Sequence, residues 1–83
     1  MNVNQAIAKT MLLVDKFNVR VERTNYRQYD CFSMTALAFK EDYLGWAKAM
    51  TKEGLTVQSK YKVVSASNNR PLYRYEIVVF FEP

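Results

Sequence analysis

The stretch LYRYEIVVFF, residues 72–81, is the most apolar part of this 83-residue chain, and it limits the fold more than any other feature. β-Branched and aromatic residues dominate it, which predicts a β-strand. Its odd-numbered positions are apolar or aromatic throughout, and the alternate face also carries apolar residues toward its end, Val78 and Phe80. A strand that is apolar on both faces is typical of a buried position, so we expect residues 72–81 to form a central strand.

Two helices and three further strands are predicted ahead of this strand. Apolar residues recur at helical spacing in the first helix, and the second helix has acidic residues in its first turn and lysines toward its end, as the helix dipole favours. The other strands alternate or are rich in β-forming residues. The expected elements are helices at 3–17 and 41–53, strands at 19–26, 31–39, 55–65 and 72–81, and a turn at 66–71.

Short polar residues and glycine mark the ends of both helices. Asn2 or Asn4 is suited to cap the first helix, and Asn18 and Gly54 suit the left-handed conformation that follows a helix. The segments around these last two residues, DKFNVRV and TKEGLTV, share a helix end and a strand start, which suggests a pseudo-two-fold αββ repeat. Gly45 inside the second helix is expected to let that helix approach the sheet closely.

The order αββαββ favours a single α+β domain over residues 1–83, a two-layer sandwich with a four-stranded antiparallel or mixed sheet. Moving the first strand of a ferredoxin-like βαββαβ unit to its end gives the same order. In that permuted arrangement we expect strands 31–39 and 72–81 to lie side by side and parallel in the centre. The charged strands 19–26 and 55–65 are expected at the edges, where charge opposes aggregation.

Both helices are expected on one face of this sheet, so that the opposite face is uncovered. Strand alternation places residues of three strands under the helices: Val19 and Val21; Leu55, Val57, Tyr61 and Val63; and Tyr73, Tyr75, Ile77, Val79 and Phe81. The pattern leaves open which face of strand 31–39 is buried. The uncovered face is expected to have an apolar end formed by Leu37, Val64, Val78 and Phe80.

The residue inventory argues against an enzyme. There is no histidine, which removes the commonest general base, the Ser-His-Asp and Cys-His arrangements and most zinc sites. The only cysteine, Cys31, is expected to be a small buried side chain, and two glycines cannot make a phosphate-binding loop. We therefore expect no catalytic residue, no metal and no cofactor.

The net charge of +4 comes from one segment. Residues 54–75 contain Lys60, Lys62, Arg70 and Arg74 and no acidic residue, whereas the charges elsewhere balance. A localised positive field attracts anionic partners, although a small net charge often serves solubility alone. One alternative is therefore a small basic nucleic-acid-binding protein that uses Lys60, Lys62, Arg70, Arg74 and, on the first strand, Arg20.

The uncovered sheet face favours a non-enzymatic protein-binding module. An apolar patch on a small domain usually marks a partner, here another protein or a second copy of the chain in a homodimer. The expected contact residues are Leu37, Val64, Val78, Phe80 and Arg74. Short domains without histidine or motifs are frequent among phage and mobile-element accessory proteins that bind a host component, and we expect that class here.

A cytoplasmic location is the expectation from cysteine usage and hydropathy. One unpaired cysteine fits a reducing compartment. No apolar run approaches the ~20 residues that span a bilayer, and no signal peptide is evident at the start of the sequence. We therefore expect no membrane partner.

Overall fold

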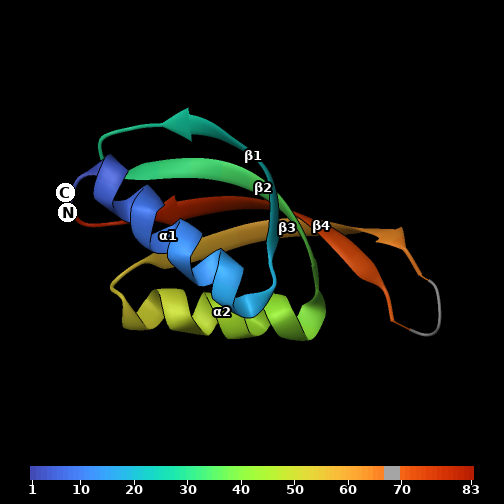
Figure 1. The fold of residues 1–83 in the computed structure, drawn as a ribbon. Helices are drawn as coiled ribbons and strands as arrows, with labels where there is room; N and C mark the ends of the chain where they lie inside the picture. Colours follow the sequence, from blue (N-terminus) through green and yellow to red (C-terminus); the bar gives the residue numbers. More distant parts are fainter. Residues whose placement is uncertain (67–69) are drawn as a thin grey trace.

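Two helices lie on one face of a four-stranded antiparallel sheet in the computed structural model of the chain, which describes residues 1–66 and 70–83 (Figure 1). The α+β class and the order of elements are as predicted, and each element boundary lies within one residue of the expected one. The predicted turn at 66–71 lies partly outside the described residues. The elements are α1 (Val3–Phe17), β1 (Arg20–Arg27), β2 (Cys31–Phe39), α2 (Lys40–Lys52), β3 (Thr56–Ser65) and β4 (Leu72–Phe80).

Helix α1 begins and ends where the sequence provides caps. The Asn2 side chain accepts a hydrogen bond from the Gln5 backbone N–H at 2.9 Å, and the Gln5 side chain accepts one from the Asn2 N–H at 2.8 Å. This capping box satisfies two backbone donors that a helix start leaves unpaired. Asn18 ends the helix in the left-handed conformation with φ 61°.

Helix α2 packs against α1 through its glycine. A Cβ atom on Gly45 would lie 3.1 Å from Cδ1 of Phe17, closer than ordinary van der Waals contact. Gly45 therefore permits a close approach of the two helices, whereas the sequence had suggested an approach of α2 to the sheet. Gly54 follows the helix with φ 81°, where glycine is unstrained.

The strand order is β1-β2-β4-β3, which places β2 and β4 in the centre as predicted. The expected parallel pairing of these two strands is wrong, because β2 and β4 are antiparallel. Helix α2 returns the chain across the sheet, so that β3 runs in the direction of β2. The β3–β4 hairpin then reverses the chain, which makes β4 antiparallel to both of its neighbours.

The core lies between the sheet and the helices. Strand β2 buries its even-numbered residues, which settles the face that the sequence left open, and β4 buries Tyr75, Ile77 and Val79. Trp46 of α2 is the largest fully buried side chain. The core residues are Ala6, Val14, Val19, Phe32, Met34, Ala36, Ala38, Tyr43, Trp46, Met50, Leu55, Tyr75, Ile77, Val79 and Phe81.

The ends of β3 and β4 that lie nearest to each other in sequence project beyond both helices (Figure 1). This gives the molecule an elongated shape, with extents of 42 × 22 × 17 Å. Tyr61 and Val63 lie on the helix side of this projection, yet they are 67% and 55% exposed. The prediction that helices cover them is wrong, because α2 begins at Lys40 and does not reach under this part of the sheet.

In the described ranges neither helix has the length and apolar character needed to cross a membrane.

Candidate functional site

The face of the sheet opposite the helices, here called the outer sheet face, is open and largely polar. It is formed by the side chains that alternate with the core residues of the four strands. Across the sheet these residues stand in rows that the strand register defines. They are Arg20, Glu22 and Arg23 of β1; Ser33, Thr35 and Leu37 of β2; Gln58, Lys60 and Lys62 of β3; and Arg74, Glu76, Val78 and Phe80 of β4.

Five basic and two acidic residues stand on the outer sheet face, so it is positively charged. Arg20, Arg74 and Lys62 share one row with Leu37, and Lys60 pairs across the strands with Glu76. The sequence predicted Arg74 as a contact residue, but in the structure its guanidinium is bound by Glu22 of the same chain. Lys60 and Lys62 form no ion pair with the described residues.

Arg74 is held by Glu22 of β1 across the intervening strand. Its Nε lies 2.8 Å from Glu22 Oε1 and its Nη2 lies 3.0 Å from Oε2, a two-point contact between guanidinium and carboxylate. The hydrogen bond and the charge of Arg74 lower the pKa of Glu22. A partner that used Arg74 would therefore have to compete with Glu22.

The apolar residues predicted on this face do not form one patch. Leu37 lies opposite Arg74, whereas Val78 and Phe80 lie opposite Ser33 and Cys31. Four residues of strand separate Leu37 from Val78, which corresponds to about 13 Å. Val64 lies at the register shift near the other end of β3 and is 44% exposed. The prediction that these four residues form one continuous apolar end of the face is therefore wrong.

The centre of the outer sheet face is hollowed. A depression of about 450 Å³ is lined by the polar residues Asn25, Ser33, Thr35, Gln58, Ser59, Lys60 and Glu76 and by the apolar residues Met34, Ile77 and Val78. Its lining offers hydrogen-bond donors and acceptors together with apolar surface. A ligand here would contact both polar groups and apolar side-chain surface.

The predicted basic segment does not form one surface either. Lys60, Lys62 and Arg74 lie on the outer sheet face, while Arg70 turns to the end of the sheet. Its guanidinium carbon lies 3.8 Å from the centre of the Phe39 ring, and its Nη2 lies 3.0 Å from Oε1 of Glu41. Arg70 thus connects the residues just before β4 to the start of α2, and it lies apart from Lys60, Lys62 and Arg74.

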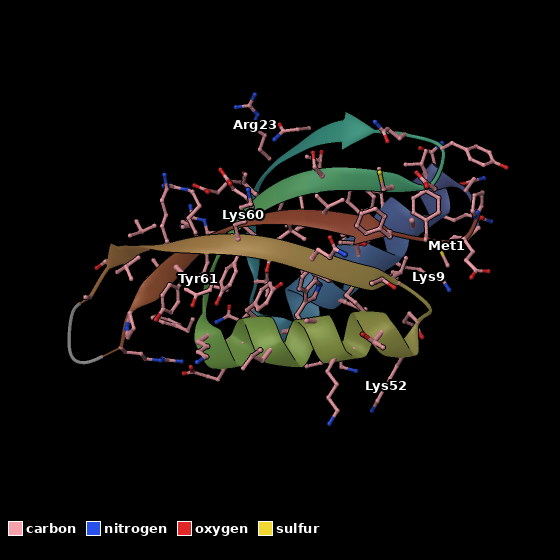
Figure 2. The ribbon with its side chains drawn as sticks, turned by 180° about the vertical axis from the view of Figure 1, so that it is seen from behind. Met1, Lys9, Arg23, Lys52, Lys60 and Tyr61 are labelled. Carbon is pink, nitrogen blue, oxygen red and sulfur yellow. The ribbon has the colours of Figure 1, made fainter. Side chains whose placement is uncertain are left out.

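A second exposed surface lies on the helix side of the projecting strands, here called the hairpin surface. It consists of Leu44 on α2, Tyr61 and Val63 on β3, and Tyr73 on β4. Leu44 is 54% exposed, and Tyr61 and Val63 are exposed to a similar extent or more. In Figure 2 the Tyr61 ring lies on the α2 side of the strands, with Lys60 on the opposite side. Apolar and aromatic groups are thus concentrated here, away from the charged outer sheet face.

Four tyrosines form the base of the hairpin surface. The rings of Tyr43 and Tyr75 are stacked with centroids 3.9 Å apart, and Tyr61 packs edge-on against Tyr73 at 5.2 Å. The Tyr43 hydroxyl shares a hydrogen bond with the Ser59 hydroxyl. Packing of this kind fixes the rings, so Tyr61 and Tyr73 present a rigid surface that loses little conformational entropy on binding.

A small hollow opens between these rings and the first turns of α2. Its volume is about 160 Å³, and its walls include Lys40, Leu44, Tyr61 and Tyr73. Tyr75 lies beneath it, where burial, together with the neighbouring tyrosines, raises its pKa to about 12. The Tyr75 phenol therefore stays neutral near pH 7, and the floor of the hollow is aromatic.

Cys31 differs from its predicted environment. It stands half-buried at the start of β2, and its thiol donates to Gln28 Oε1 at 3.4 Å. Burial, with Asp30 adding to the effect, raises the pKa of this thiol. The thiolate that a nucleophile needs is therefore disfavoured. Among the described residues no cluster of three or more potential metal ligands occurs.

Strand periodicity does not reveal the hairpin surface. Strand alternation correctly assigned Tyr61 and Val63 to the helix side, but alternation does not say where the covering helix ends. The predicted lengths of the second helix and the third strand were the signal that could have revealed it. Helix α2 has 13 residues, about 20 Å at 1.5 Å per residue, while the ten residues of β3 span about 33 Å.

Comparison with models of known protein families gave no match to this chain, and comparison with curated protein sequences gave no significant match.

Proposed function

We propose that this protein is a non-enzymatic protein-binding module and that the hairpin surface is its contact site. The observation that carries the proposal is the exposure of Leu44 on α2 and of Tyr61 and Val63 on the part of β3 that no helix covers. Each is more than half exposed, and Leu44 and Tyr61 line the same hollow. Rigid tyrosines flanked by aliphatic side chains are typical of the energetically important centre of a protein interface. On the outer sheet face, which the sequence favoured, the described apolar residues Leu37, Val78 and Phe80 are half-buried, and the register separates Leu37 from the other two.

The ionisable groups support binding over catalysis. The carboxylates whose pKa is lowered are Glu22, chiefly through its hydrogen bond with Arg74, and Glu41, chiefly through a backbone hydrogen bond and then through Arg70. The pKa values of Tyr75 and Cys31 are raised, so both groups stay protonated at neutral pH. Glu22 and Glu41 are thus engaged by arginines, and Tyr75 and Cys31 are held in the protonated form, which disfavours the free base or nucleophile that catalysis requires.

Self-association through the outer sheet faces is disfavoured by charge. Two copies stacked face to face would bring five basic and two acidic residues of each copy together. Like charges placed opposite one another in an interface make the free energy of association less favourable by roughly several kcal/mol. A homodimer, which the sequence left open, would therefore use the hairpin surface in preference to the outer sheet face.

Nucleic-acid binding is a second candidate, and the positive charge of the outer sheet face favours it. Arg20, Lys60 and Lys62 belong to this face, while Arg74 is engaged by Glu22. Stacking of bases on exposed aromatic rings usually accompanies such charge. The aromatic residues on this face whose side chains the structure describes are Phe39 and Phe80; both are half-buried, and the Arg70 guanidinium lies over the Phe39 ring. We therefore place this candidate second.

The proposal is tested by affinity capture from an extract of the cells that make the protein. The native chain is compared with Tyr61→Asp on the hairpin surface, and with Val78→Asp and Phe80→Asp on the outer sheet face. All three substitutions introduce the same charge into β3 or β4. Circular dichroism and the fluorescence of the single Trp46 verify that each variant is folded.

We expect Tyr61→Asp to lose a protein that the native chain and Val78→Asp both retain. Loss with Val78→Asp or Phe80→Asp alone would return the contact site to the outer sheet face and overturn the proposal. Retention of nucleic acid in place of protein, falling steeply as salt rises, would favour the second candidate.

Three finer expectations accompany this proposal and remain predictions. They are the cytoplasmic location, the role as an accessory protein of a phage or mobile element, and the origin of the fold by permutation and αββ duplication. A two-layer α+β domain with a surface suited to a protein partner is compatible with each. The identity of the captured partner is the observation that bears most directly on the first two.

A further inference from the structure

Strand β3 is an edge strand with a long regular stretch. It pairs with β4 in an unbroken register from Thr56 to Val63, and its other side faces no strand in the described sheet. All ten of its residues are exposed except Val57, which is half-buried. An edge of this kind presents backbone N–H and C=O groups at alternate residues, ready to pair with another strand.

The opposite edge of the sheet is different. Strand β1 pairs with β2 through two register shifts, one between Val21 and Arg23 and one between Thr24 and Tyr26. Such irregularities twist a strand and interrupt the straight row of backbone groups that an incoming strand needs. Of the two edges, β3 is therefore the one suited to accept an added strand.

The side chains of β3 set the chemistry of such a strand. Lys60 and Lys62 lie toward the outer sheet face, and Tyr61 and Val63 lie toward the helix side. A strand that paired with this edge would place alternate residues beside the lysines and the others beside Tyr61 and Val63. Charge complementarity calls for acidic residues in the first set, and the exposed ring and methyl groups call for apolar residues in the second.

The hollow beside Tyr61 adds a position for one large side chain. At about 160 Å³ it is suited to a single leucine or phenylalanine side chain, and Leu44 and Tyr73 contribute to its walls. It lies along the helix side of the β3 edge, so the apolar residues of an added strand would point toward it. Backbone pairing would give affinity, and this pocket would give specificity.

We infer that the β3 edge binds an extended segment of a partner protein in which acidic residues alternate with leucine or an aromatic residue, and that the segment joins the sheet as a fifth strand. This inference rests on the proposed function, since it names the partner chemistry of the hairpin surface. A second copy of β3 fits less well. Antiparallel pairing of two such edges would bring the lysines of one copy near those of the other.

The test uses a fluorescein-labelled peptide of about eight residues, the length of the regular β3 register, in which glutamate alternates with leucine and one phenylalanine. Binding to the full chain is measured by fluorescence anisotropy at near-physiological salt. Three control peptides are used. One has lysine in place of glutamate, one has the same composition with all glutamates together, and one has N-methyl groups on alternate amides, which block pairing along one edge.

Charge variants locate the site. Lys60→Glu combined with Lys62→Glu is expected to weaken binding about tenfold or more. Arg23→Glu is the control, because it reverses one charge on the outer sheet face at the other edge, as each of the two lysine substitutions does at the β3 edge (Figure 2). Tyr61→Ala tests the pocket and is expected to weaken binding to a similar degree. Circular dichroism verifies that each variant keeps its fold.

We expect the alternating peptide to bind and the three control peptides not to bind. We also expect the Lys60→Glu and Lys62→Glu double variant to weaken this binding and Arg23→Glu to leave it unchanged. Equal binding of the N-methylated or segregated peptide would reduce the interaction to charge attraction and overturn the inference. So would a dimer of the chain alone that Tyr61→Ala dissociates, or preferential binding of an oligonucleotide. If the peptide fails while Tyr61→Asp still loses a captured protein, the inference falls and the proposed function stands.

Discussion

Replacement of Phe81 by alanine tests the placement of β4 in the centre of the sheet. Phe81 is 5% exposed, packs with the core, and donates its backbone N–H to the Asp30 carbonyl at 3.0 Å. Truncation of a buried phenylalanine costs about 3–5 kcal/mol, because contacts are lost and a cavity remains. The whole free energy of unfolding of a chain this long is roughly 4–12 kcal/mol. Phe81→Ala therefore removes a large share of it.

Phe80→Ala is the matched control for this substitution. Phe80 is the preceding residue, has the same chemistry, and lies half-buried on the outer sheet face opposite Cys31. Partial burial limits the expected loss to about 1 kcal/mol. Urea denaturation followed by the fluorescence of Trp46, which is fully buried in the native state, measures both free energies of unfolding. If Phe81→Ala is unfolded in water, Phe81→Leu gives a smaller loss that is measurable.

The reasoning is refuted if Phe80→Ala costs as much as Phe81→Ala. That result would mean that the alternation of β4 has been assigned to the wrong faces, or that something covers the outer sheet face. A loss below about 1 kcal/mol for Phe81→Ala would be equally damaging, because no fully packed phenylalanine is truncated so cheaply.

Two further predictions concern local features. Burial raises the pKa of Tyr75 to about 12 from its ordinary value of 10.0. Between these two pH values the phenol is deprotonated in the unfolded chain and protonated in the folded one. The free energy of unfolding therefore falls as the pH rises through this range. The loss from this one group is about 2–3 kcal/mol and should be absent in Tyr75→Phe, which a comparison of urea denaturation near pH 9 and near pH 11.5 checks. Asn18 has φ 61°, so Asn18→Ala should lower the thermal unfolding temperature through a cost of about 1 kcal/mol. Asn18→Gly should retain stability, and equal behaviour of the two variants would contradict the role of the backbone conformation.

The secondary structure was predictable because its signals are local. The Asn2 cap, the left-handed Asn18 and the acidic first turn of α2 act within one helical turn of each boundary. The central position of β4 was predictable as well, since its apolar residues occur on both faces. The direction of β4 relative to β2 was mispredicted, although the hairpin connection between β3 and β4, followed through the α2 crossover, was enough to derive it.

The binding surface was less predictable because it depends on tertiary arrangement. The apolar residues Leu37, Val78 and Phe80 share a face by alternation, but the register separates Leu37 from the other two. Arg74 is unpaired in any sequence reading, since its partner Glu22 is 52 residues away. The exposure of Tyr61 depends on where α2 ends in space relative to β3, which periodicity within either element does not encode.

The central claim is that the partner contacts the hairpin surface, and site-specific photo-crosslinking tests it most directly. A photoreactive phenylalanine analogue is placed at position 61 on the hairpin surface and, in a separate protein, at position 35 on the outer sheet face. Thr35 is the matched position because it lies in the middle of the uncovered polar face. We predict a crosslinked protein adduct from position 61 in the cells that make the protein, and none from position 35. An adduct from position 35 alone would contradict the account.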